Sequence, residues 1–264
     1  MLDQARLEAS LPIHGLGKPL YYFRSIDSTN AKALELAAVG APHGSLVVAE
    51  EQTAGRGRAG RRWFTPSGSG IALSLLLRWD PPAGGTSGAL SVFGALGVAE
   101  AAEQAGADAR IKWPNDVLVG GRKVAGVLVE AQWQGSSLAS AVVGIGVNVG
   151  EGSVPAPDEV DYPAGCLEQA VGRPIDPQAF LLELIRAAGR WYPKLGSLEM
   201  LEAWESRLAF RGTEVAVMDS GVRRQGRLVG LDEDGHLLLE TAGGQQLVIG
   251  PTAAELRPID SEKV

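Results

Sequence analysis

The sequence predicts an α+β fold in two parts, a large domain over residues 1–210 and a small β-barrel over residues 211–264. Strand patterns are interspersed with helical patterns as far as residue 210, whereas from Gly212 onward only short strand patterns occur, separated by Asp-Gly and Gly-Gly turns. The length of 264 residues also suits one large and one small domain, because domains commonly contain about 100–200 residues.

Local signals justify each element in order. Ser28 and Thr29 are helix N-cap residue types before an Ala/Leu-rich run that Gly40 ends, and Gly120-Gly121 predicts a hairpin between two strands. The predicted helices are 31–39, 90–105 and one or two within 177–210, while residues 1–20 have room for one short helix but not for a helix-turn-helix domain. The predicted strands are 21–23, 45–50, 71–79, 110–113, 116–119, 123–131, 140–149, 213–218, 222–231, 236–240 and 245–249, and the long loops are 51–70, 81–88 and 150–165.

Composition excludes several classes of protein. A net charge of −7 argues against a general nucleic-acid binder, since phosphate backbones are met by basic surfaces. One cysteine, Cys166, rules out an intramolecular disulfide, and three histidines far apart in sequence show no metal-ligand spacing. No apolar run approaches the ~18 residues of a membrane-spanning helix. Charged residues interrupt the first ten positions, so we expect no signal peptide and a cytoplasmic protein that does not bind membranes.

The loop over residues 51–70 predicts an anion-binding site. It holds five glycines, which let the backbone approach a ligand, and four arginines, whose planar forks bind carboxylate or phosphate. The alternative is a flexible basic loop in solvent, or an RGG-like nucleic-acid segment. Trp63, just after the arginines, is either a buried anchor or an aromatic platform for a purine ring.

Three further motifs leave alternatives open. Residues 112–116 (KWPND) are equally compatible with an ordinary turn and with a nucleotide and metal site. Lys123, at the head of an apolar strand, by itself favours an edge lysine that prevents aggregation. Gly126 and the glycines of residues 144–148 (GIGVN) flatten a strand surface, which either a ligand or a closely packed helix can cover. Rossmann and Walker A patterns are absent, which excludes those nucleotide-binding folds.

Together and in this order, the motifs closely resemble the biotin protein ligase family over residues 20–150. The matching segments are DSTN (27–30), EQTAGRGRAGRRW (51–63), KWPND (112–116), KVAG (123–126) and GIGVN (144–148). The resemblance implies a mixed β-sheet flanked by helices, related to the catalytic core of class II aminoacyl-tRNA synthetases. It also implies that the C-terminal barrel is SH3-like, a match in outline only.

The same resemblance implies roles for individual residues. Those implied to bind biotin are Ser28, Thr29, Gln52, Gly55, Arg56, Arg58, Lys123 and Gly126. Those implied to bind the nucleotide are Arg58, Arg61, Trp63, Lys112, Asn115 and Asn148. The implied catalytic residues are Lys123, Arg58 and Asp116, of which Asp116 would also organise Mg²⁺.

The activity implied is that of an ATP-dependent ligase. It would form biotinyl-5′-AMP from biotin and ATP, with Mg²⁺ and no tightly bound cofactor, and then transfer biotin to a lysine of a biotin carboxyl carrier protein domain. The family allows a homodimer. Only about twenty residues precede the core, so we expect the monofunctional type, with no DNA-binding domain and no repressor function.

The chemistry of the implied reaction adds two expectations about the site, and three alternative functions stay open. Because an acyl adenylate hydrolyses in water, we expect loop 55–70 to be disordered without ligand and to close over the bound intermediate. Asp116 is a weak candidate for the base that deprotonates the acceptor amine. The rivals are a lipoate ligase or acyltransferase of the same fold, a nucleic-acid-binding module, and a biotin sensor without turnover.

Overall fold

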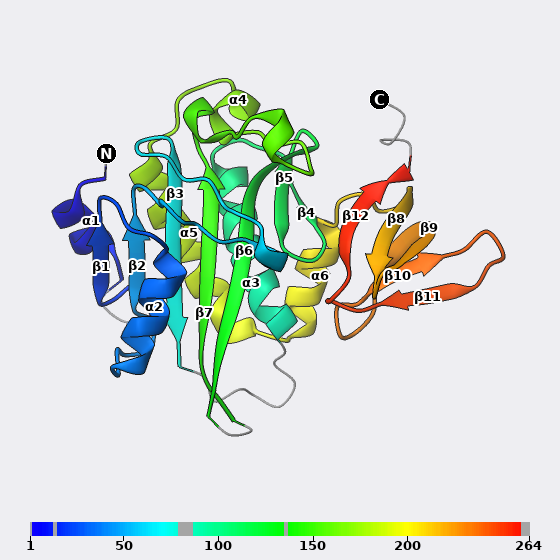
Figure 1. Cartoon of the computed structure of the whole chain (residues 1–264), viewed down its shortest axis with the longest axis horizontal. Coiled ribbons are helices and arrows are strands. Elements are labelled where there is room, and N and C mark those ends of the chain that lie inside the picture. Colours follow the sequence, from blue (N-terminus) through cyan, green and yellow to red (C-terminus); the bar gives the residue numbers. More distant parts are fainter. Residues whose placement is uncertain (1, 13–14, 79–86, 135–136, 260–264) are drawn as a thin grey trace.

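Two β-sheets organise the chain in the computed structural model, which describes residues 2–12, 15–78, 87–134 and 137–259 (Figure 1). Seven strands form a mixed sheet in the order β1-β2-β3-β7-β6-β5-β4, and five form a separate antiparallel sheet in the order β11-β10-β9-β8-β12. The pair β1 and β2 is parallel, and the remaining neighbours in the large sheet are antiparallel.

The strands of the large sheet are β1 (Leu20–Phe23), β2 (Leu46–Ala49), β3 (Gly70–Leu77), β4 (Ala109–Lys112), β5 (Asp116–Val119), β6 (Arg122–Gln134) and β7 (Ser137–Asn148). Those of the small sheet are β8 (Glu214–Asp219), β9 (Val222–Leu231), β10 (Leu237–Glu240), β11 (Gln246–Ile249) and β12 (Ala254–Pro258). The α-helices are α1 (Gln4–Ser10), α2 (Thr29–Ala38), α3 (Ser87–Gln104), α4 (Leu167–Val171), α5 (Pro177–Trp191) and α6 (Leu198–Ser206).

The predicted α+β fold with a mixed sheet flanked by helices is confirmed, and every strand predicted within the described residues forms. Two short elements, α4 and β12, were not predicted. Of the predicted linker 81–88, residues 81–86 lie outside the described part of the chain. Before β1 the described residues form the single short helix α1, and within the described chain no helix combines the length and apolarity needed to cross a membrane.

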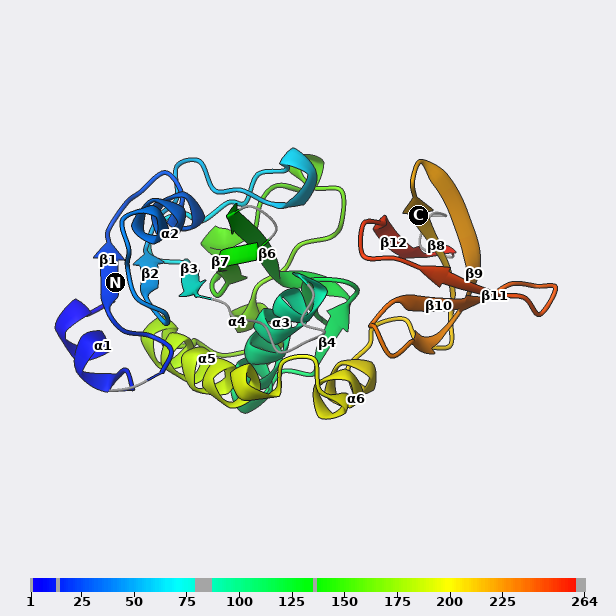
Figure 2. The same cartoon turned by 90° about the horizontal axis from the view of Figure 1, so that it is seen from below.

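Helices cover both faces of the large sheet (Figure 2). Helices α3 and α5 lie on one face, and α2 lies on the other, on the same side as the arginine-rich loop. The alternation of side chains along strands explains the division. On β6 and β7, Val127 and Val143 point toward α3, where Gly94 allows close approach: a Cβ there would lie 2.9 Å from Val127 Cγ1. The intervening positions, including Gly126 and Gly144, face the other side.

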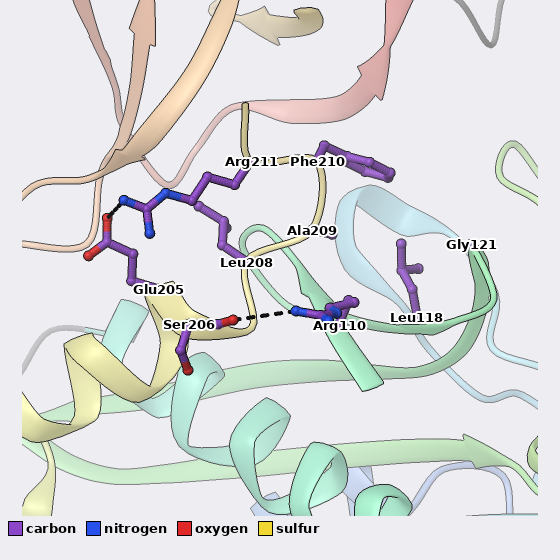
Figure 3. Close-up of a pocket in the computed structure, with 9 residues that line it drawn as sticks. All are labelled: Arg110, Leu118, Gly121, Glu205, Ser206, Leu208, Ala209, Phe210 and Arg211. Carbon is purple, nitrogen blue, oxygen red and sulfur yellow. Dashed lines mark hydrogen bonds and ion pairs between the residues drawn. The ribbon is translucent and has the colours of Figure 1, made fainter. Parts of the chain in front are cut away.

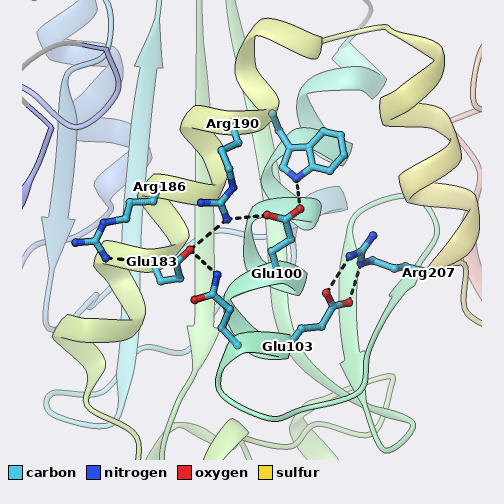
Figure 4. Close-up of polar contacts among 8 residues, drawn as sticks. Glu100, Glu103, Glu183, Arg186, Arg190 and Arg207 are labelled. Carbon is cyan, nitrogen blue, oxygen red and sulfur yellow. Dashed lines mark hydrogen bonds and ion pairs between the residues drawn. The ribbon is translucent and has the colours of Figure 1, made fainter.

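A charged network braces the helical layer (Figure 4). Glu100 of α3 accepts hydrogen bonds from Arg190 at 2.9 Å and from Trp191 Nε1 at 2.8 Å. Glu103 accepts two from Arg207, at 2.7 and 2.9 Å. Bidentate carboxylate–guanidinium pairs fix orientation as well as distance, so this pair holds the segment that follows α6.

That segment covers the edge of the large sheet and leads to the small one. The N–H of Ile111 in β4 donates to Arg207 O at 2.7 Å, and the N–H of Ala209 donates to Ile111 O at 2.9 Å. These bonds satisfy part of the open edge of β4. The small sheet follows and contacts the large one, because the buried Trp113 donates its indole N–H to Gly235 O at 3.0 Å.

Candidate active site

A polar cluster lies where α2 begins. The side chain of Ser28 caps the helix, and Gln52 Oε1 accepts the N–H of Thr29 at 2.9 Å and lies 3.1 Å from its hydroxyl. Gly55 stands beside them: a Cβ there would lie 2.8 Å from Gln52 Nε2 and 2.3 Å from Trp63 O, so a larger residue would displace both segments. The structure therefore brings together four residues implied to bind biotin.

The arginine loop folds back on itself. Backbone N–H groups donate from Gln52 to Thr65 O at 3.0 Å and from Trp63 to Gly55 O at 2.9 Å. Its tip is a short 3₁₀ turn, η1 (Arg58–Gly60). The loop is thus a narrow hairpin whose arginines project toward surrounding elements.

Three arginines of the loop, Arg56, Arg58 and Arg61, contact different partners. Arg56 forms an ion pair with Glu130 of β6 at 2.9 Å. Arg58 donates to Asn115 Oδ1 at 3.1 Å and to the Pro251 carbonyl of the small sheet at 2.8 Å, and burial lowers its pKa.

Arg61 lies farther out. It forms ion pairs with Asp161 at 3.0 Å and with Glu255 at 3.4 Å, and all three side chains are about half exposed or more. Ion pairs between exposed groups contribute little to stability. Their effect here is to connect the arginine loop with the segment before α4 and with β12.

Two lysines share one buried carboxylate at the β4–β5 turn. Lys123 Nζ lies 2.6 Å from Asp116 Oδ1, and Lys112 Nζ lies 3.5 Å from Asp116 Oδ2. Burial alone would raise the pKa of Asp116, but the two ammonium groups outweigh it and the pKa is lowered. Burial lowers the pKa of Lys112. Two cations against one anion leave the cluster positively charged, which suits an anionic ligand.

The interpretation of Lys123 as an edge lysine is wrong. Its strand, β6, lies between β5 and β7 in the interior of the large sheet. The backbone of Lys123 also bonds to the segment before α4, since its N–H donates to Pro163 O at 2.8 Å and its carbonyl accepts from Gly165 N at 3.0 Å. The lysine is therefore held by β5 and by the segment before α4, with its ammonium group on Asp116.

Trp63 lies on the glycine face of β6 and β7. A Cβ on Gly146 would lie 2.1 Å from Trp63 Nε1, and one on Gly126 would lie 3.3 Å from the indole and 3.3 Å from Lys123 Nζ. The Lys123 ammonium stands 5.4 Å from the indole centroid. The indole N–H is buried and has no hydrogen-bond partner among the described residues. Gly144 shows the close sheet–helix packing that was one of the two alternatives, because its neighbour is Asn30 of α2.

The two predicted nucleotide-binding asparagines are buried. Asn115 donates to Val127 O at 2.7 Å while its own side-chain oxygen accepts from Arg58, so it orients that guanidinium. Asn148 donates to Gly165 O at 3.0 Å. Asn115 joins the Arg58 loop to the lysine–aspartate cluster, since it directly precedes Asp116.

Sequence reasoning missed three polar residues on the same face. Ser74, Asn30 and Glu130 bond to the residues of this site. A signal was present for two of them: Ser74 interrupts the apolar run IALSLLL, and Glu130 is the one charged residue in VAGVLVEA. A polar side chain amid buried apolar ones requires a partner.

Other concave or polar features lie elsewhere. The pocket in Figure 3 is formed by the β4 edge and the segment after α6, and its arginines, Arg110 and Arg211, bond to neighbouring groups. Among the described residues, Asp232, Asp234 and His236 are close enough to share a cation, a spacing that the sequence had not suggested. They form a turn of the small sheet in which His236 Nδ1 lies 3.0 Å from Asp232.

Comparison with known proteins identifies the family. Residues 22–148 match the biotin/lipoate A/B protein ligase family. The chain is 39% identical over 236 residues to the biotin–[acetyl-CoA-carboxylase] ligase of Paracoccus denitrificans, spanning 84% of this chain and 94% of that relative. It is 36% identical over 247 residues to the bifunctional ligase/repressor BirA of Bacillus subtilis, spanning 92% of this chain and 76% of that relative. The biotin protein ligase of Aquifex aeolicus in complex with biotin and ATP has the same fold, with a TM-score of 0.77, 30% identity and coverage of 92% of this chain and 100% of that one. This chain therefore belongs to the biotin/lipoate A/B protein ligase family and, within it, to the biotin protein ligases.

Proposed function

We propose that this chain forms biotinyl-5′-AMP from biotin and ATP and then transfers biotin to a lysine of a biotin carboxyl carrier protein domain. The names of its relatives supply the reaction and the carboxylase, and the Aquifex aeolicus neighbour binds both biotin and ATP. One observation carries the proposal: Lys112, Lys123 and Arg58 gather around Asp116 beside the glycine face of the sheet. Such an arrangement suits a reaction between two anions.

The biotin end of the site is proposed at the start of α2. Ser28, Thr29 and Gln52 supply hydroxyl and amide groups that match the N–H donors and carbonyl acceptor of a cyclic urea. Gly55, Arg56 and Gly126 complete the proposed biotin contacts. The valeryl carboxylate would then reach toward Lys123.

In the first step, a biotin carboxylate oxygen attacks the α-phosphorus of ATP and pyrophosphate leaves. Both reactants are anions, so their approach is unfavourable without cations. Lys123 and Arg58 would offset the repulsion and stabilise the charge that develops at the α-phosphate. Arg61, Trp63, Lys112, Asn115 and Asn148 are the proposed nucleotide contacts.

In the second step, the amine of the carrier lysine attacks the acyl carbon and AMP leaves. The amine must lose a proton to attack. Asp116 is poorly suited to accept that proton, because its two lysine neighbours lower its pKa. We propose instead that Asp116 orients the two ammonium groups.

Magnesium is proposed as the ion that accompanies ATP, where the phosphates supply its ligands. The donor set around Asp116 does not fit a resident magnesium ion. Its two oxygens already face two ammonium groups, and a dication there would be repelled by both. No step is assigned to a protein-bound metal.

The five-stranded sheet is proposed as the SH3-like domain of the family, residues 211–264, with residues 1–210 as the catalytic domain. Its Pro251 carbonyl contacts Arg58, which supports a role in ordering the arginine loop. A homodimer is proposed through β1, which has no strand neighbour on its outer side among the described strands. A cytoplasmic location and the absence of DNA binding complete the proposal; a filter-binding assay with salt titration tests the latter.

Transfer to a carrier tests the proposed function. The protein is incubated with ATP, Mg²⁺ and an isolated biotin carboxyl carrier domain in three parallel reactions that contain biotin, lipoate or octanoate. The mass of the carrier is then measured by intact mass spectrometry. One biotin per carrier, and none of the other acids, is expected. Modification by lipoate or octanoate instead would assign the chain to the rival activity.

A further inference from the structure

A hydrogen-bonded chain runs from the polar cluster at α2 to the arginine loop. The hydroxyls of Thr29 and Ser74 are 2.8 Å apart, and Ser74 Oγ lies 2.6 Å from Asn30 Oδ1. Asn30 Nδ2 donates to Glu130 Oε2 at 2.7 Å, and the same oxygen accepts from Arg56 at 2.9 Å. The two links among Thr29, Ser74 and Asn30 are buried, since these residues are 3%, 0% and 4% exposed, whereas the two links through Glu130 are partly exposed.

The large sheet leaves room for this relay of hydrogen-bonded side chains, which comprises Thr29, Ser74, Asn30, Glu130 and Arg56. Ser74 of β3 pairs with Gly144 of β7. A Cβ on Gly144 would lie 2.0 Å from Asn30 Oδ1, so only glycine leaves room for the asparagine. Asn30 also donates its second amide proton to Leu128 O at 3.2 Å. Its amide is therefore fixed at both ends.

Counting the protons that each side chain can donate assigns donor and acceptor roles along this relay. The Glu130 carboxylate only accepts, so the nitrogen of Asn30 must face it and the oxygen must face Ser74. Ser74 then donates its single proton to Asn30, which leaves only lone pairs toward Thr29. The Thr29 hydroxyl then faces two acceptors, Ser74 Oγ at 2.8 Å and Gln52 Oε1 at 3.1 Å, and its single proton is used in one of these two contacts. Thr29 Oγ1 therefore has only lone pairs to offer a further ligand.

We propose that Asn30, Ser74 and Glu130 are positioning residues that fix the Thr29 hydroxyl as a hydrogen-bond acceptor and tie it to Arg56. The inference rests on the proposed function, because the group that Thr29 would recognise is a ring N–H of the biotin urea. It assigns Glu130 two tasks. The carboxylate orients the buried chain through Asn30, and it anchors the arginine loop through Arg56.

The test compares two relay variants with two matched controls. Glu130→Gln keeps the shape of the side chain and removes its charge; Glu130 is 25% exposed at its side chain, so the variant should fold. Glu100→Gln is its control, since Glu100 also accepts from an arginine and a second N–H donor. Ser74→Ala is compared with Ser45→Ala, which removes the hydroxyl of another buried serine, one that donates to Pro42 O at 2.7 Å.

The readout is biotin-dependent pyrophosphate exchange with separate KM values for biotin and ATP, alongside thermal melting. Glu130→Gln and Ser74→Ala should each raise the KM for biotin up to about tenfold, the scale of one neutral hydrogen bond, with kcat and the KM for ATP unchanged. The KM for biotin of the double variant should be no higher than that of the more impaired single variant, because both changes break the same relay. Both controls should keep the wild-type KM values for biotin and for ATP.

Two results would overturn the inference. If wild-type protein is active and the relay variants keep its KM for biotin, the relay does not position the site. If both KM values rise together and melting drops, the residues are merely structural. Wild-type protein without biotin-dependent exchange would instead refute the proposed function, and this inference with it.

Discussion

Replacing Asp116 with asparagine tests the lysine–aspartate cluster most sharply. Asn keeps the size of the side chain and removes the charge that two ammonium groups share. Removing one partner of a buried ion pair costs about 3–5 kcal/mol, because the remaining charge stays buried. The Lys123 side chain is 26% exposed and can regain water, whereas that of Lys112 is 10% exposed.

We therefore expect a loss of about 3 kcal/mol for Asp116→Asn, mostly from Lys112. For a domain of this size the loss corresponds to a decrease in Tm of about 6–12 °C. The pKa of Asp116 is lowered in the folded state, so its stabilisation is present above the ordinary carboxyl range and disappears as the pH falls through the lowered value. The Tm difference should hold from pH 5 to 8 and shrink below about pH 4.

The assay is differential scanning calorimetry of the wild type, Asp116→Asn, and the double variant Lys112→Met/Asp116→Asn. The double variant should be more stable than the single one, since it removes the stranded charge as well. The reasoning about a shared buried carboxylate fails if Asp116→Asn has the same Tm as the wild type. It also fails if the double variant has a lower Tm than Asp116→Asn.

Three further predictions concern separate parts of the molecule. Burial and the 2.6 Å hydrogen bond to Glu50 raise the pKa of Tyr22 to about 12. The contribution of this phenol to the stability of the fold is therefore complete below pH 10 and is lost as the pH rises through 12. An ultraviolet difference titration of wild type against Tyr22→Phe should show ionisation of this phenol near pH 12, and a transition near pH 10 would contradict it. Gly146→Ala places a methyl group 2.1 Å from Trp63 Nε1 and should cost about 1–3 kcal/mol in urea unfolding with a changed tryptophan emission; no cost would mean that the indole does not lie on this strand. Trp113→Phe removes the buried 3.0 Å bond to the small sheet and should cost about 1–3 kcal/mol, so an unchanged urea midpoint would refute a stabilising role.

Much of the fold could be predicted because local signals were strong. The Ser28 cap marked the start of α2, and mainly apolar runs marked the strands of the buried sheet. The short helix α4 gives no periodic pattern over its five residues. Strand β12 was not predicted, because Glu255 adopts φ 59° within it and its register with β8 shifts there. This irregularity interrupts the alternation of side chains on which strand prediction depends.

The site could be predicted only as far as its motifs extend. Residue types and order pointed to Lys123, but its position beside Asp116 depends on strand order, and the apolar run around it fitted an edge strand as well as an interior one. The relay through Ser74 and Glu130 required the register of β6 with β7 and that of β3 with β7, and the latter pairs Ser74 with Gly144, far along the chain. Such pairings are set by the packing of the whole sheet and leave no local sequence signal.

Biotin-dependent exchange of labelled pyrophosphate into ATP, by the wild type and by Lys123→Met, tests the central claim most directly. The wild type should exchange with biotin, and the variant, shown by calorimetry to be folded, should lose about 10²–10³-fold in kcat because the cation beside the reacting anions is gone. Full exchange by Lys123→Met would remove this cluster from the chemistry, and no exchange by folded wild-type protein would contradict the assignment of a biotin-activating enzyme.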